Sequence, residues 1–83
     1  MKKVIRFTAS WCGPCKLFAP TFDKVASQTP GVYFETVDVD SGSTLILEHG
    51  IRNVPTTVVI ENDGSTRKQA GIMGEDQLKK FIG

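Results

Sequence analysis

The chain has 83 residues, of which 40% are apolar, and its 10 basic and 9 acidic residues leave a net charge of +1. This length predicts one domain over residues 1–83, and the apolar content excludes a disordered chain. The near-neutral charge, with no basic stripe, argues against nucleic-acid binding. No segment approaches the ~18 apolar residues of a membrane span, and the first apolar run stops at Arg6, too early for a signal peptide. We therefore expect a cytoplasmic protein.

The first half of the chain predicts a strand, a helix and a second strand. Residues 2–9 alternate weakly and are rich in branched and aromatic side chains, which is typical of a strand. Apolar residues then recur every three or four positions from Cys12 to about Gln28, which predicts a helix. Pro20 interrupts this pattern, and we favour one kinked helix over two short ones. Residues 29–31 end the helix, and residues 32–38 predict the second strand.

The second half predicts a short helix, a hairpin and a final helix. Ser43 can cap a helix over residues 44–49, which Gly50 ends. Residues 55–61 predict a strand with a buried run at residues 58–60, residues 62–65 a turn, and residues 65–72 a more polar edge strand. Residues 74–82 predict the last helix. The order β-α-β, short α, β-β-α predicts an α/β fold with a four-stranded mixed sheet and a central first strand.

Both cysteines of the chain lie where the first strand meets the first helix, in the segment Trp11-Cys12-Gly13-Pro14-Cys15-Lys16. A helix N-terminus leaves backbone N–H groups unpaired and carries partial positive charge, so a sulfur there ionises more easily. With Cys12 at the N-cap, Cys15 lies one turn later and can attack a mixed disulfide formed by Cys12. We therefore predict a dithiol redox site in which Cys12 is the nucleophile and Cys15 the resolving cysteine. Pro14 suits the first helical turn, and Gly13 adds no side chain that would block a docking substrate.

The alternative for this cysteine pair is half of a metal site. Zinc prefers four ligands, and His49 is the only other soft candidate ligand in the chain. A metal would therefore have to be shared across two cysteine pairs of a dimer. We predict a redox site with no metal.

The segment Trp11-Cys12-Gly13-Pro14-Cys15-Lys16 resembles the active-site motif of the thioredoxin family. Residues 50–56, residues 62–64 and Gly71 also resemble family segments in the same order, so the resemblance covers nearly the whole chain. It implies a thioredoxin-like fold that lacks the N-terminal strand and helix of full-length thioredoxins. It also implies a protein-disulfide reductase. We expect a monomer, with no bound cofactor because both electrons reside on the sulfurs. Such a protein reduces disulfides of substrate proteins and is recharged by thioredoxin reductase, which uses NADPH.

Pro55 resembles the cis-proline that faces the active-site disulfide in this family. A cis bond would turn the chain so that the backbone at Val54 can pair with an extended substrate peptide. The alternative is an ordinary trans proline that opens a strand. Four more residues are expected to support the site or line its groove: Trp11, Lys16, Gly71 and Ile72.

Two positions depart from the family pattern. Thioredoxins usually carry a buried Asp five residues before the Trp and a partner Lys on the next strand, where this chain has Arg6 and Thr36. In the family this Asp is assigned a proton-transfer role behind the resolving thiol. Arginine cannot act as a base near neutral pH, so Arg6 cannot take over that role. A buried unpaired Arg is costly, so we expect Arg6 to pair with Asp38 or to reach solvent past the active site. In either position its charge would favour the thiolate.

Two other functions are compatible with the sequence. A glutaredoxin-like reductase recharged by glutathione fits the short chain and the acidic helix start in residues 71–76, although Cys-Gly-Pro-Cys argues against it. A binding module, in which the reduced active-site face serves as a subunit of a larger complex, needs no redox activity. Replacing both cysteines would separate these functions, because binding would survive and reduction would not.

Overall fold

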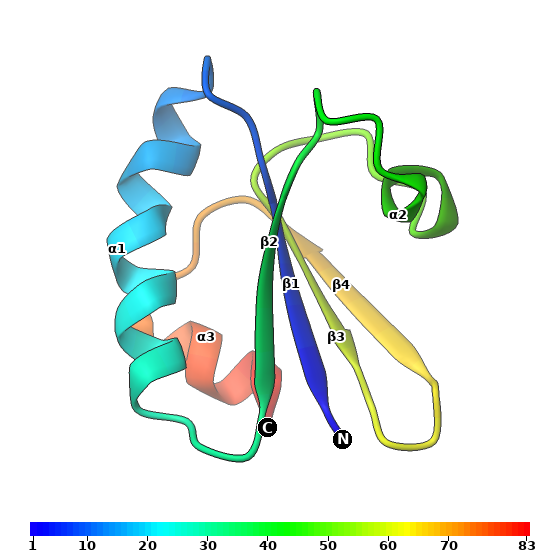
Figure 1. The fold of residues 1–83 in the computed structure, drawn as a ribbon. Helices are drawn as coiled ribbons and strands as arrows, with labels where there is room; N and C mark the ends of the chain where they lie inside the picture. The colour runs from blue at the N-terminus through cyan, green and yellow to red at the C-terminus, as the bar shows by residue number, and fades with distance from the viewer.

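The chain folds into a four-stranded mixed sheet with helices on both faces (Figure 1), and the computed structural model describes all 83 residues. The elements in chain order are β1 (Lys3–Thr8), α1 (Gly13–Ser27), β2 (Tyr33–Asp38), α2 (Thr44–Glu48), β3 (Thr56–Ile60), β4 (Thr66–Ala70) and α3 (Glu75–Ile82). The strand order is β2-β1-β3-β4, with β1 parallel to β2 and antiparallel to β3. Every predicted element is present within two residues of its expected bounds, and the central position of β1 is confirmed.

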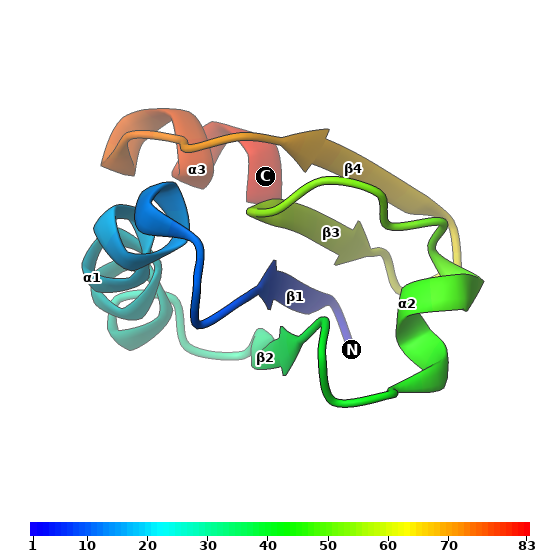
Figure 2. The same cartoon turned by 90° about the horizontal axis from the view of Figure 1, so that it is seen from above.

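The central strands are buried on both faces, because α1 and α3 cover one face of the sheet and α2 lies over the other (Figure 2). Side chains alternate along a strand, so Val4 faces α1 and α3 while Ile5 and Phe7 face α2. The larger cluster, under α1 and α3, comprises Val4, Phe18, Phe22, Val25, Val59, Met73, Leu78 and Ile82. Packing on both faces therefore fixes the position of β1, and the cysteine motif begins just after the carboxyl end of this strand.

Helix α1 is one continuous helix, as predicted, although it contains Pro20. Pro20 is exposed, so its ring lies on the solvent side of the helix. Buried residues recur at three- and four-residue spacing on the opposite side: Cys15, Phe18, Phe22 and Val25. This face packs on the sheet, so the packing orients the start of α1 above the carboxyl end of β1.

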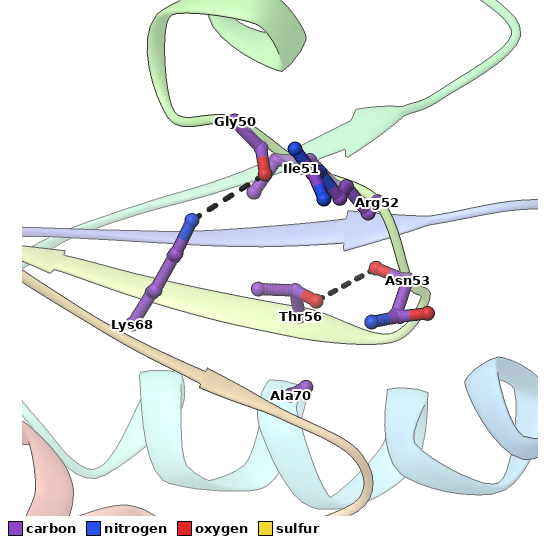
Figure 3. A pocket seen from close by; sticks show the side chains of 7 residues that line it. All are labelled: Gly50, Ile51, Arg52, Asn53, Thr56, Lys68 and Ala70. Carbon is purple, nitrogen blue, oxygen red and sulfur yellow. Dashed lines mark hydrogen bonds between the residues drawn. The ribbon is translucent and has the colours of Figure 1, made fainter.

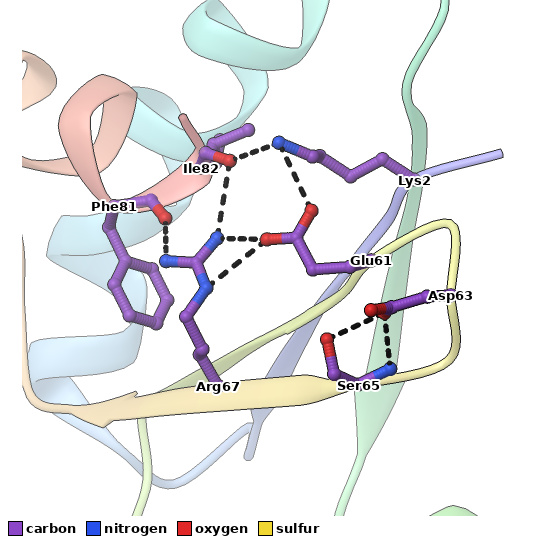
Figure 4. A network of polar contacts seen from close by, with 7 residues as sticks. All are labelled: Lys2, Glu61, Asp63, Ser65, Arg67, Phe81 and Ile82. Atoms are coloured by element: carbon purple, nitrogen blue, oxygen red, sulfur yellow. Dashed lines mark hydrogen bonds and ion pairs between the residues drawn. The ribbon is translucent and has the colours of Figure 1, made fainter.

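The carboxyl end of α3 is tied to the sheet by a polar network (Figure 4). The Lys2 ammonium donates to the Ile82 carbonyl at 2.6 Å, and the Arg67 guanidinium donates to the carbonyls of Phe81 and Ile82. Glu61 joins the two cations, because its carboxylate lies 2.6 Å from Arg67 Nη2 and 3.4 Å from Lys2 Nζ. The network therefore satisfies carbonyls at a helix end, which have no partner within the helix.

We expect Glu61 to make the stability of this end of the fold pH-dependent. The hydrogen bond from Arg67, assisted by Lys2, holds the pKa of the Glu61 carboxyl below its usual value. A carboxyl with a lower pKa in the folded state contributes stability above about pH 4.3, and this stability is lost as the pH falls through the folded pKa. The Tm difference between the wild type and Glu61→Gln should therefore shrink between pH 7 and pH 2. Glu48→Gln is the control, since exposed Glu48 makes no ion pair. A difference that stays constant over this range would contradict the prediction.

Candidate active site

The two cysteines occupy the first turn of α1. Cys12 is the N-cap residue, and the backbone N–H of Cys15 donates to Cys12 Sγ at 3.1 Å. The two sulfurs are joined as a disulfide. The first turn of α1 contains no acidic residue that would oppose negative charge on a sulfur. When the pair is reduced, a thiolate on Cys12 would therefore have an N–H donor and the positive end of the helix beside it.

Both cysteines are nearly buried in the oxidised protein. Cys15 is 1% exposed and Cys12 is 5% exposed, and both pack against Ala9. Gly13 and Pro14, which lie between them, are exposed. A substrate can therefore approach this turn from outside. The order of attack, with Cys12 as the nucleophile and Cys15 as the resolving cysteine, stays a prediction.

The segment around Pro55 faces the cysteines. The Val54–Pro55 peptide bond is cis, as predicted, and the Val54 carbonyl oxygen lies 3.7 Å from Cys12 Sγ. The N–H of Gly71 donates to the Pro55 carbonyl at 2.8 Å and so ties the end of β4 to this segment. Gly71 has φ = +94°, a conformation that favours glycine, and a Cβ built there would meet no atom within 4 Å. Glycine is thus required by the backbone conformation and not by close approach of another segment of the chain.

Large apolar side chains are exposed near the motif. Trp11 is 68% exposed and is therefore not a core aromatic, and Leu17 and Ile72 are also exposed, at 74% and 48%. The Trp11 indole N–H donates to Asp40 Oδ2 at 2.9 Å, which fixes one edge of this surface. Sequence reasoning missed Asp40. The sequence pattern could have placed Asp40 near Trp11. The carboxyl ends of parallel β1 and β2 meet at one edge of the sheet, and Asp40 follows β2 as Trp11 follows β1.

Comparison with known proteins identifies the family. The sequence model described as Thioredoxin matches residues 1–83, the full length of this chain. The chain belongs to the thioredoxin family. A thioredoxin of Mycoplasmoides gallisepticum is 35% identical over 81 residues, which cover 98% of this chain and 81% of that protein. The solved structure of Fasciola hepatica thioredoxin superposes with a TM-score of 0.87 at 34% identity, covering 98% of this chain and 77% of that one.

Some thioredoxin relatives are considerably longer than this chain. A mitochondrial thioredoxin of Bos taurus is 40% identical over 80 residues, which cover 95% of this chain and 48% of that protein. The chain thus spans about half the length of the first curated relatives that it matches.

Arg6, at the family's buried acidic position, does not pair with Asp38, contrary to our expectation. It is 8% exposed, and none of the ion pairs in the structure includes it. Its Nη2 donates to Thr36 Oγ1 at 3.3 Å, and its guanidinium carbon lies 5.3 Å from the centroid of the Phe22 ring. Asp38 instead accepts a hydrogen bond from the backbone N–H of Asp40. The guanidinium therefore extends under α1 toward β2 and does not pass the active site to reach solvent.

The surroundings of Arg6 leave polar atoms unsatisfied. Arg6 Nε and Thr57 Oγ1 are both buried without a hydrogen-bond partner. Thr57 on β3 is the register partner of Arg6, on the side opposite Thr36. Burial lowers the pKa of the Arg6 guanidinium from its ordinary value, and the negative charge of Asp23 on α1 partly opposes this effect. Sequence reasoning missed Thr57, because its place opposite Arg6 depends on the pairing and register of β1 and β3.

The remaining predicted site residues make few contacts. Lys16 is exposed and takes part in no ion pair. His49 lies away from the sulfurs, with its ring centroid 6.0 Å from that of Phe7 in the core beneath α2.

No group of three or more His, Cys, Asp or Glu side chains is arranged to hold a metal ion. None of the three helices is long and apolar enough to cross a membrane.

Proposed function

We propose that this protein is a thiol–disulfide oxidoreductase that reduces disulfides of other proteins through Cys12 and Cys15. The observation that carries the proposal is Cys12 at the N-cap of α1, with its Sγ within 3.1 Å of the Cys15 N–H and 3.7 Å of the Val54 carbonyl. The first contact stabilises an attacking thiolate. The second places the sulfur beside the backbone on which an extended substrate segment would pair.

The reaction proceeds in two exchanges that balance in atoms and electrons. The Cys12 thiolate attacks one sulfur of the substrate disulfide, so a mixed disulfide forms and the other substrate sulfur leaves as a thiolate. The Cys15 thiolate then attacks Cys12 Sγ, which releases the second substrate sulfur and forms the Cys12–Cys15 disulfide. Two electrons pass to the substrate, and its two thiolates take up protons from solvent.

We propose thioredoxin reductase with NADPH as the electron donor, by analogy with the family. The chain itself supplies no bound cofactor in this scheme, because both electrons reside on the sulfurs. A reducing compartment such as the cytoplasm suits a protein that must return to its dithiol form. We expect the monomer to be the working unit, since both cysteines and Val54 come from one chain.

The test is the reduction potential of the Cys12–Cys15 pair, measured by equilibration with graded glutathione buffers and by mass spectrometry. We expect a potential well below that of the glutathione pool, and turnover with thioredoxin reductase and NADPH but not with glutathione. A potential near or above the glutathione pool, with glutathione adducts on Cys12, would favour the glutaredoxin-like alternative. The absence of a reversible disulfide would overturn the redox assignment and leave the binding module.

A further inference from the structure

A cleft of about 580 Å³ opens on the α2 face of the sheet, between the segment Gly50–Asn53 and strand β4 (Figure 3). Its floor includes Thr56 of β3, and its far wall includes Lys68 of β4. The cleft contains none of the residues through which the proposed reaction proceeds. It is large enough for one or two side chains of a partner and too small for a folded segment.

The charge that lines this cleft is positive and has no anionic partner. Arg52 is exposed and makes no hydrogen bond or ion pair. Lys68 donates from Nζ to the carbonyls of His49 at 2.9 Å and Gly50 at 3.4 Å, which holds its ammonium in place. No Asp or Glu is among the lining residues. A fixed ammonium and an unpaired guanidinium therefore favour a carboxylate, because charge-assisted hydrogen bonds are the strong ones.

Two residues that line the cleft directly precede an active-site residue in the sequence. Arg52 and Asn53 directly precede Val54, whose carbonyl oxygen lies 3.7 Å from Cys12 Sγ. The Thr56 hydroxyl donates to the Asn53 carbonyl at 2.7 Å, which fixes this connection at the start of β3. A substrate strand that pairs at Val54 would thus carry the residues beside its disulfide toward Arg52.

We propose that this cleft binds an acidic side chain of the substrate protein, a few residues from the disulfide that Cys12 attacks. This inference rests on the proposed reductase function and names the class of segment that it prefers. A nucleic-acid partner is disfavoured, because the chain has a net charge of only +1 and the two cations stand alone in the cleft.

The test uses two synthetic peptides, each closed by one internal disulfide. The peptides are identical except at two positions, one on each side of the disulfide. One peptide carries Asp and Glu at these positions, and the other carries Asn and Gln. We expect kcat/KM for the acidic peptide to be about five-fold higher at low ionic strength. Most of this preference should disappear at 0.5 M salt, where the Debye length is about 4 Å.

Arg52→Gln should remove most of the preference, while the rate on the neutral peptide stays near that of the wild type. Lys80→Gln is the matched control, because it removes one positive charge from an exposed residue of α3 that makes no ion pair. A preference that survives in Arg52→Gln, or one that Lys80→Gln also abolishes, would overturn the assignment of the cleft. Equal wild-type rates on both peptides would overturn it while leaving the reductase function intact. Reduction of neither peptide, nor of any other disulfide substrate, would refute the reductase function itself.

Discussion

Replacing Cys15 with serine is expected to convert the protein from a catalyst into a covalent trap for its substrate. Cys12 would keep its N-cap position and the N–H donor at residue 15, because that donor belongs to the backbone. The first exchange would therefore still occur, but no internal thiol could attack the mixed disulfide. We expect turnover to fall by at least about 10³-fold, as when a member of a catalytic unit is lost. Mass spectrometry should detect substrate bound through Cys12.

The reverse replacement, Cys12→Ser, provides the matched comparison. Cys15 is 1% exposed, so its thiol should react slowly with a protein disulfide and form little adduct. Loss of turnover without accumulation of a mixed disulfide is the expected outcome. If Cys12→Ser captured substrate as fast as Cys15→Ser, the roles assigned to the two cysteines would be wrong. An external thiol should release the adduct of Cys15→Ser, which confirms that the bond is a disulfide.

Replacing Arg6 with methionine is expected to raise the free energy of unfolding by about 1–3 kcal/mol. Arg6 is 8% exposed, has no ion pair, and leaves Nε without a hydrogen-bond partner. Removing a buried charge that lacks a close partner ends its desolvation cost, and methionine retains apolar contact with Phe22. Urea unfolding at pH 7, with the pair kept oxidised, measures the change. A loss of stability would show that the guanidinium contributes more through Thr36 and Phe22 than its burial costs.

The same variant, Arg6→Met, tests whether the positive charge of Arg6 lowers the pKa of the active-site thiol. The guanidinium lies against Phe22, seven residues after Cys15 and therefore about 10 Å farther along α1. At this separation Coulomb's law allows a rise in thiol pKa of about one unit at most when the charge is removed. Arg6→Lys is the control, since it keeps the charge and should leave the thiol titration nearly unchanged. If the thiol pKa did not rise at all in Arg6→Met, the electrostatic role of Arg6 would be refuted.

The order of elements and the position of the sulfurs could be determined from the sequence alone. Apolar periodicity, turn residues and capping residues act over a few neighbouring positions, so the bounds of all seven elements were predicted within two residues. Cys12 at the N-cap follows from the same local rules. The cis bond at Val54–Pro55 was predicted from the family resemblance, since a proline by itself favours trans.

Tertiary structure decided which distant side chains meet. Arg6 bonds to Thr36 instead of Asp38, because the register of β1 and β2 places Thr36 directly opposite Arg6 and Asp38 opposite Thr8. The bond from Trp11 to Asp40 and the cleft between Arg52 and Lys68 likewise join segments far apart in sequence. A pattern in one segment predicts which face a side chain occupies. The partner on that face depends on strand order, register and the path of the side chain, and these exist only in the folded chain.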